Sequence, residues 1–86
     1  MTVYVDSMFA PYRGMKMCHM VADSRKELLD MVDKIGVDRK WIQHKGTPRE
    51  HFDIAASKRK LAVSFGAVEV TRRELGKILK EKRESS

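Results

Sequence analysis

Two of the three histidines in this 86-residue chain are followed closely by an aspartate, and these four residues are the first candidates for chemistry. His19 lies four residues before Asp23, and His51 lies two residues before Asp53. Imidazole and carboxylate groups ligate metal ions, transfer protons as general acids and bases, and capture anions when the imidazole is protonated. The pairing narrows the chemistry to these three kinds and leaves all three open.

A metal site is one interpretation of these residue types. The candidate ligands are Asp6, His19, Asp23, His51 and Asp53, which together supply enough nitrogen and oxygen donors for Zn²⁺ or Mn²⁺. No pair among them has the helical i, i+4 histidine spacing that marks many metalloenzymes. The residue types therefore leave a divalent metal cofactor open, and no motif specifies one.

Capture of an anion is the second interpretation, because positive charge is concentrated in the second half of the chain. Residues 1–36 carry five Lys or Arg against five Asp or Glu, whereas residues 37–86 carry thirteen against seven, which accounts for the whole net charge of +6. A one-sided basic surface is expected of a protein that binds phosphates, although solvated helix faces explain it equally well. The expected ligand-binding residues are Asp6, Arg13, His19, Arg49 and His51, and the expected nucleic-acid contacts are Lys58, Arg59 and Lys60.

Hydrophobic periodicity and capping signals divide the chain into alternating strands and helices. We expect strands at 2–5, 17–22 and 67–70, a loop at 7–16 and a short strand at 41–43. We expect helices at 24–35, 54–65 and 71–82, the first and third opened by capping boxes at Ser24/Glu27 and Thr71/Glu74 and the second capped by Asp53. The second helix would bury Ile54, Ala55, Leu61, Ala62 and Phe65, and residues 83–86 would fray.

This order of elements predicts an α/β fold. Residues 1–82 would form one small domain in which three helices pack on a partly parallel sheet of three to four strands. In such sheets ligands bind beyond the carboxyl ends of strands, where we expect Asp6, Asp23 and Thr71. Asp6, Arg13, His19 and His51 are therefore predicted to line one crevice at the edge of the sheet.

Purely structural roles compete with these assignments at several positions. His19 could be a buried neutral histidine inside a strand, and Asp53 could serve only as a helix cap. Trp41, which lies among basic residues, is expected in the core at a turn and not as a stacking platform for a base. The lone Cys18 has no partner for an internal disulfide, so we expect a cytoplasmic protein in a reducing compartment, and no segment resembles a membrane span.

An ordered series of short motifs resembles the bacterial and bacteriophage family called domain of unknown function 4031. The motifs are Met-Thr-Val-Tyr-Val-Asp6, Met17-Cys-His-Met-Val-Ala-Asp23, Trp41-Ile-Gln43, His51-Phe-Asp53 and Gly66-Ala-Val-Glu-Val70. The resemblance implies a stand-alone cytoplasmic protein, often associated with phages or prophages, and points to the histidines and aspartates of these motifs. The family pattern often has an acidic residue where this chain has Ser7, which weakens a scheme with two adjacent carboxylate ligands.

Three functions remain open from the sequence. The protein could bind a phosphate-bearing ligand, nucleic acid or nucleotide, through its basic half together with Arg13, His19 and His51. It could be a small metal-dependent phosphoesterase that uses Asp6, His19, His51 and Asp53. It could also be a phage accessory protein that docks on a host protein, and the sequence leaves the oligomeric state open.

Overall fold

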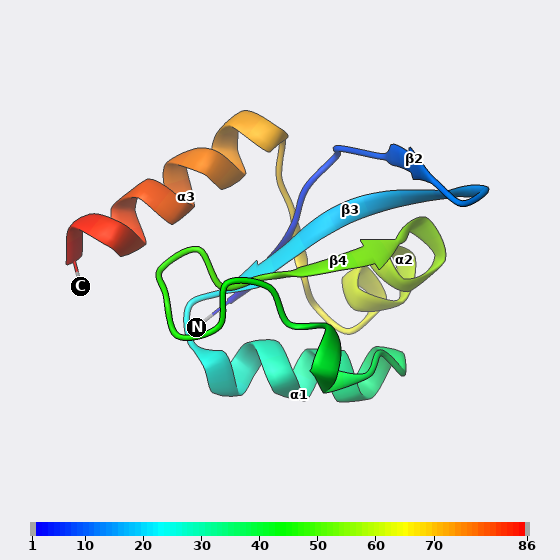
Figure 1. Ribbon diagram of the computed structural model, residues 1–86, viewed down its shortest axis with the longest axis horizontal. Coiled ribbons are helices and arrows are strands. Elements are labelled where there is room, and N and C mark those ends of the chain that lie inside the picture. Colours follow the sequence, from blue (N-terminus) through cyan, green and yellow to red (C-terminus); the bar gives the residue numbers. More distant parts are fainter. Residues whose placement is uncertain (1, 86) are drawn as a thin grey trace.

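The computed structural model describes residues 2–85, which fold into three helices and a five-stranded sheet (Figure 1). The elements in chain order are β1 (Val3–Val5), β2 (Ala10–Tyr12), β3 (Met15–Ala22), α1 (Arg25–Ile35), the 3-10 turn η1 (Arg39–Trp41), β4 (Phe52–Ala55), α2 (Ala56–Ser64), β5 (Val68–Glu69) and α3 (Arg72–Ser85). The α/β class predicted from the sequence is confirmed, and one of the strand pairs, β1 with β5, is parallel.

Strand β3 is the centre of the sheet. Met20 of β3 lies opposite Val5 of β1 and also opposite Phe52 of β4, so β1 and β4 flank β3 on opposite edges. Strand β2 pairs with the first residues of β3 on the same edge as β1, and all three pairings with β3 are antiparallel. Strand β5 extends the sheet beyond β1. The longest strand is therefore held by neighbours on both edges.

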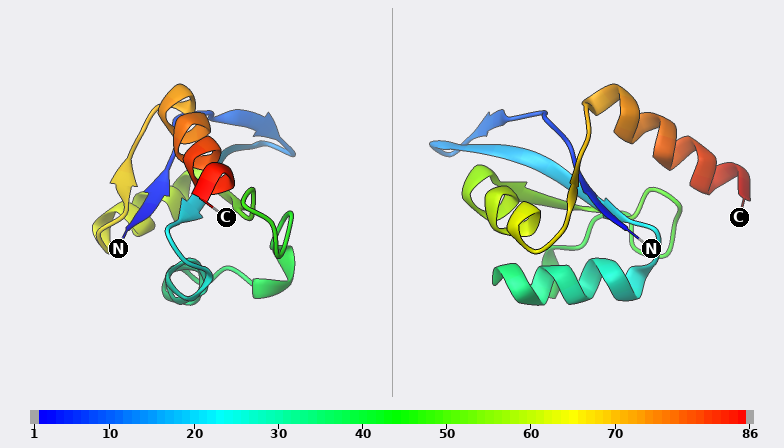
Figure 2. Two further views of the ribbon diagram at one scale, coloured as in Figure 1. Left: turned by 90° about the vertical axis from the view of Figure 1, so that its left-hand side faces the viewer. Right: turned by 180° about the vertical axis from the view of Figure 1, so that it is seen from behind.

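The two faces of the sheet have different neighbours. On one face, alternate residues of β1, β3 and β4 form the core with α1 and one residue of α2: Val3, Val5, Met20, Ala22, Phe52, Ile54, Leu28, Met31, Val32, Ile35 and Ala62. Helix α3 lies on the other side of the sheet from α1 in all three views (Figure 2). Polar side chains of β3 and β4 can therefore project toward α3 without entering the core.

Helices α1 and α3 begin where the capping boxes predict. The amide of Glu27 donates to Ser24 Oγ at 3.3 Å, and α1 ends at Gly36, whose φ of 76° is the left-handed conformation that favours glycine. At α3, Glu74 N donates to Thr71 Oγ1 and Thr71 N donates to Glu74 Oε1, at 3.1 and 2.8 Å. Helix α3 continues to Ser85, so the described residues that were expected to fray are helical. No helix among residues 2–85 is long and apolar enough to cross a membrane.

The prediction for the second helix is wrong at its start. Residues 52–55 pair with β3 as β4, so α2 begins at Ala56 and Asp53 does not cap it. The shift also changes which side chains are buried: Leu61 and Phe65, expected in the core, are 42% and 50% exposed. A long-range strand pairing has overridden a locally plausible helix start.

Two other segments differ from the prediction. The expected loop at 7–16 contains β2 and a tight turn at Arg13 and Gly14, both with positive φ, as a type I′ hairpin turn requires. The strand expected at 41–43 is absent: Trp41 is the last residue of the turn η1, Ile42 caps it, and Gln43 forms a single bridge to His51. Trp41 is 58% exposed with the Lys40 ammonium over its ring, so its assignment to the core is wrong.

Candidate functional site

The candidate site lies on the α3 side of the sheet, across the pairing of β3 with β4. His19 lies directly opposite Asp53 in this register, while Cys18 and Met20 on either side of His19 are fully buried. Because side chains alternate between faces along a strand, the same pleat that buries Cys18 and Met20 projects His19 away from α1. The sheet register therefore fixes which imidazole and which carboxylate face one another.

Asp6 follows the last residue of β1 and anchors one end of the site. Its side chain is 1% exposed, and its carboxylate accepts hydrogen bonds from the amides of His19 and Met8 at 2.8 and 3.2 Å. A third hydrogen bond, at 2.7 Å, joins its Oδ2 to Nδ1 of His19. Burial alone would raise the pKa of this carboxyl, but these hydrogen bonds outweigh it and hold the pKa below its ordinary value. Asp6 is therefore a buried anion whose hydrogen bonds fix the imidazole of His19.

His19 is oriented by this contact. A carboxylate oxygen accepts only, so the hydrogen of the 2.7 Å contact belongs to Nδ1 and the other ring nitrogen, Nε2, points toward Oδ1 of Asp53 at 3.6 Å. The hydrogen bond to Asp6 raises the pKa of His19, and partial burial opposes that effect without cancelling it. The imidazole side chain remains 29% exposed.

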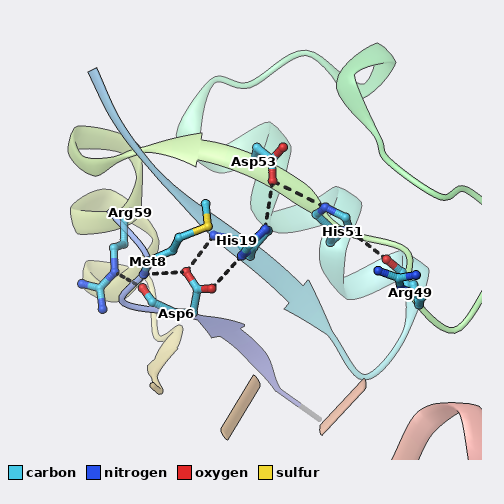
Figure 3. Close-up of polar contacts among 7 residues, drawn as sticks. All are labelled: Asp6, Met8, His19, Arg49, His51, Asp53 and Arg59. Carbon is cyan, nitrogen blue, oxygen red and sulfur yellow. Dashed lines mark hydrogen bonds and ion pairs between the residues drawn. The ribbon is translucent and has the colours of Figure 1, made fainter. Parts of the chain in front are cut away.

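His51 is oriented in the same way by a different acceptor. Its Nδ1 donates to the carbonyl oxygen of Arg49 at 2.7 Å, and its Nε2 lies 3.4 Å from Oδ1 of Asp53. A backbone bridge to Gln43 holds the segment at the entrance to β4. His51 is followed by strand β4 and not by the helix predicted at 54–65. Figure 3 shows the Asp53 carboxylate facing both imidazoles.

The three groups form one compact cluster. The ligand atoms of His19, His51 and Asp53 all lie within 4.8 Å of one another, and the two imidazole rings meet edge to face with centroids 5.2 Å apart. Such a set of two imidazoles and one carboxylate can ligate a divalent metal ion, or it can hold and transfer a proton. The third histidine, His44, stacks on the outer side of His51 at 5.6 Å.

A pocket of about 180 Å³ opens beside this cluster, between the sheet and α3. Asp6, His19 and His51 line it together with two arginines, Arg49 from the loop before β4 and Arg72 from the first turn of α3. The rest of the lining is small or apolar: Val21, Leu75, Gly76 and Leu79. The pocket thus combines two guanidinium groups with the exposed edge of the histidine cluster.

Several residues singled out from the sequence lie elsewhere. Arg13 is at the tip of the β2–β3 hairpin, with its guanidinium on the Tyr12 ring, and does not line the pocket. Asp23 accepts a hydrogen bond from the amide of Thr2 and lies outside the cluster. Arg59 is engaged within the fold, because it donates to the carbonyl of Asp6 and to Glu69 with only 12% of its side chain exposed.

The remaining predicted contacts, Lys58 and Lys60, lie on α2, which does not line the pocket. The structure also brings in residues that the sequence analysis missed. In the sequence, Arg72 contributes only to the net charge of residues 37–86, and nothing there indicates a role for His44. One signal in the sequence could have identified Arg72. It lies directly after the strand at 68–69 and the Thr71 cap, at the start of α3. A hydrogen bond from Val70 to Val5 brings this start of α3 back to the end of β1.

A comparison with protein-family models identifies the same family that the sequence motifs resemble. The family model described as Protein of unknown function (DUF4031) matches residues 3–82 of the 86-residue chain. The chain belongs to the DUF4031 family. The match spans β1 to most of α3, so every residue of the cluster and of the pocket lies within the DUF4031 region. No curated protein and no solved structure gives a significant match.

Proposed function

We propose that this protein is a cytoplasmic binder of a phosphate-bearing ligand, a nucleotide or a nucleic acid. The observation that carries the proposal is the pair of arginines in the pocket. Arg49 and Arg72 come from different elements, line the same pocket, and have no ion-pair partner among residues 2–85. By contrast, Arg25, Arg39 and Arg59 each pair with a carboxylate.

Guanidinium groups without carboxylate partners are suited to phosphate, which they bind with two parallel hydrogen bonds. The carboxylate of Asp6 remains an anion, but both of its oxygens already accept hydrogen bonds from His19 or Met8, so it does not pair with the arginines. The pocket, at about 180 Å³, is large enough for a phosphate group with its ester substituents and too small for a whole dinucleotide. A base or sugar would therefore extend along the surface outside. A cytoplasmic location is supported by the free, buried thiol of Cys18.

The test compares three arginine variants with labelled single-stranded DNA, single-stranded RNA, a nucleoside triphosphate and inorganic phosphate as probes. Arg49→Gln and Arg72→Gln should each weaken binding about tenfold. With the single-stranded probes, each phosphate contact contributes about 0.7 to the slope of log affinity against log salt, so the double variant should lower that slope by about 1.4. Arg39→Gln is the matched control, because its partner Asp33 lies on α1 and outside the pocket. Absence of binding by the parent protein to all four probes at low salt would overturn the proposal.

A second candidate is a metal-dependent phosphoesterase, favoured by the position of the histidine cluster on the wall of the same pocket. A metal ion there would polarise a phosphoryl oxygen or activate water. The water would attack phosphorus, the bond from phosphorus to the leaving oxygen would break, and that oxygen would take up a proton. Release of p-nitrophenol from bis(p-nitrophenyl) phosphate, dependent on added Zn²⁺ or Mn²⁺ and lost in Asp53→Asn, is the expected result. The same rate in both proteins would exclude this site.

A further inference from the structure

We propose that His19, His51 and Asp53 bind one divalent transition-metal ion, and that Zn²⁺ fits this donor set best. The site is built from the end of the loop before β4, from β4 itself and from the middle of β3. It is a binding proposal and does not depend on phosphate binding by Arg49 and Arg72. The phosphoesterase candidate does depend on it.

The distances between the donor atoms are the first argument. Nε2 of His19 and Nε2 of His51 lie 3.6 and 3.4 Å from the same oxygen, Oδ1 of Asp53. Both distances exceed the usual N–H···O range of about 2.7–3.2 Å. Two donors bound tetrahedrally to one ion, each at about 2.1 Å, lie about 3.4 Å apart. These two separations from Asp53 are closer to those of atoms that share an ion than to those of atoms that share a hydrogen, and the ligand atoms of the two histidines lie within 4.8 Å of each other.

The second argument comes from what holds the two rings. Nδ1 of His19 donates to the buried Asp6 carboxylate, and Nδ1 of His51 donates to the Arg49 carbonyl. Each neutral ring therefore carries its lone pair on Nε2, and both lone pairs face a carboxylate oxygen. This arrangement is repulsive unless a metal cation lies between the three atoms or an imidazole takes up a proton on Nε2. A carboxylate or a carbonyl on the far nitrogen of each imidazole is also the usual support of histidine ligands to zinc.

The third argument concerns the kind of metal. Two imidazole nitrogens and one carboxylate oxygen suit Zn²⁺, Fe²⁺, Co²⁺ or Mn²⁺, whereas Mg²⁺ and Ca²⁺ prefer oxygen ligands alone. Among these metals, Zn²⁺ readily accepts three protein ligands with a fourth position left for water or substrate. Because His19 and His51 also line the pocket with Arg49 and Arg72, that fourth position would face the proposed phosphate site.

The experiment measures metal uptake by the full chain alone, without phosphate. Protein freed of metal with a chelator is titrated with Zn²⁺ by calorimetry and with Co²⁺ by visible absorption, in which tetrahedral Co²⁺ gives an intense d–d band. We expect one ion per chain, and a loss of affinity of at least about 100-fold in His51→Gln and in Asp53→Asn. Asp53 is 42% exposed, so its substitution leaves the core intact.

His44→Gln is the matched control, because His44 stacks on His51 but is not part of the cluster. It should bind Zn²⁺ like the parent. Asp6→Asn, which removes the support of His19 and keeps all three ligands, should weaken Zn²⁺ binding about 10–100-fold. Circular dichroism of each metal-free variant checks that it is folded. A folded parent that takes up no ion, or Asp53→Asn and His51→Gln that bind as tightly as the parent, would overturn the site. Neither result decides whether Arg49 and Arg72 bind phosphate, because that binding is measured separately, in the presence of chelator.

Discussion

Gly76→Ala is expected to stabilise the fold and at the same time to weaken ligand binding. Gly76 is the fifth residue of the 14-residue helix α3, and a Cβ built on it meets no atom within 4 Å. An exposed interior helical glycine costs about 1 kcal/mol relative to alanine. The gain of about 1 kcal/mol should raise the melting temperature of a domain of this size by about 4–8 °C.

The added methyl group would project into the pocket that Gly76 lines. A methyl group is similar in size to a water molecule, whose share of the liquid is about 30 Å³, so it would take about a sixth of the 180 Å³. We therefore expect several-fold weaker binding of the phosphate probe by Gly76→Ala. Thermal unfolding and fluorescence titration of the same preparation measure the two effects together.

Gly66→Ala is the matched control for the stability effect. A Cβ at Gly66 also meets no atom within 4 Å, but its φ of +105° is one that side chains rarely adopt. The same chemical change should therefore destabilise the protein by at least about 1 kcal/mol while leaving probe affinity unchanged. Loss of stability in Gly76→Ala would refute the helix argument. Gained stability with unchanged probe affinity would show that the ligand does not enter this pocket.

Further changes test the structural basis of the site. Ser24→Ala removes the N-terminal cap of α1 and should cost about 1 kcal/mol in urea unfolding, with Lys26→Ala as a surface control. Glu50→Gln breaks the contact of Glu50 with Arg25 and should cost about 1 kcal/mol at pH 7, since Arg25 is half exposed. Burial raises the pKa of Glu50, but Arg25 and the Gly46 amide outweigh it and lower the pKa below 4.5. The free energy that ionised Glu50 contributes to stability is therefore present above pH 4.5 and is lost as the pH falls through the folded-state pKa of Glu50. The difference in unfolding free energy between parent and Glu50→Gln should shrink on acidification, and a difference that grows would contradict the ion pair.

Local chemistry was sufficient for the parts of the fold that depend on neighbours in sequence. The capping boxes at Ser24 and Thr71 predicted the starts of α1 and α3 because both partners lie within one helical turn. Strand β4 was missed for the opposite reason. Its four residues carry an aspartate that resembles a cap, and only pairing with β3 makes them extended. Strand β2 was hidden by Pro11 and Gly14, which are typical of loops.

In the candidate site, too, the residue types could be read from the sequence, whereas the contacts between them depend on long-range pairing. Residue types alone identified Asp6, His19, His51 and Asp53 as candidates, but no spacing in the sequence brings Asp6 to Nδ1 of His19. That contact requires β1 to lie beside β3 in the observed register. Arg49 was among the residues predicted to bind a ligand, but Arg72 was not, because a count of charges does not show which cations have carboxylate partners. Ion pairing within the fold separates Arg59, which is engaged, from Arg72, which is not.

The register between β3 and β4 also determines when the site comes into existence. The hairpin of β1 and β2 with β3 is local, so the Asp6–His19 contact can form early in folding. Asp53 and His51 arrive only after the whole segment that contains α1 has been looped back, which has a larger entropic cost. A chain arrested before β4 docks would keep one oriented imidazole and lack the rest of the cluster. Binding at the cluster would then report the docking of β4 on β3, and a ligand present during refolding would stabilise that step and not the earlier pairing of β1 with β3.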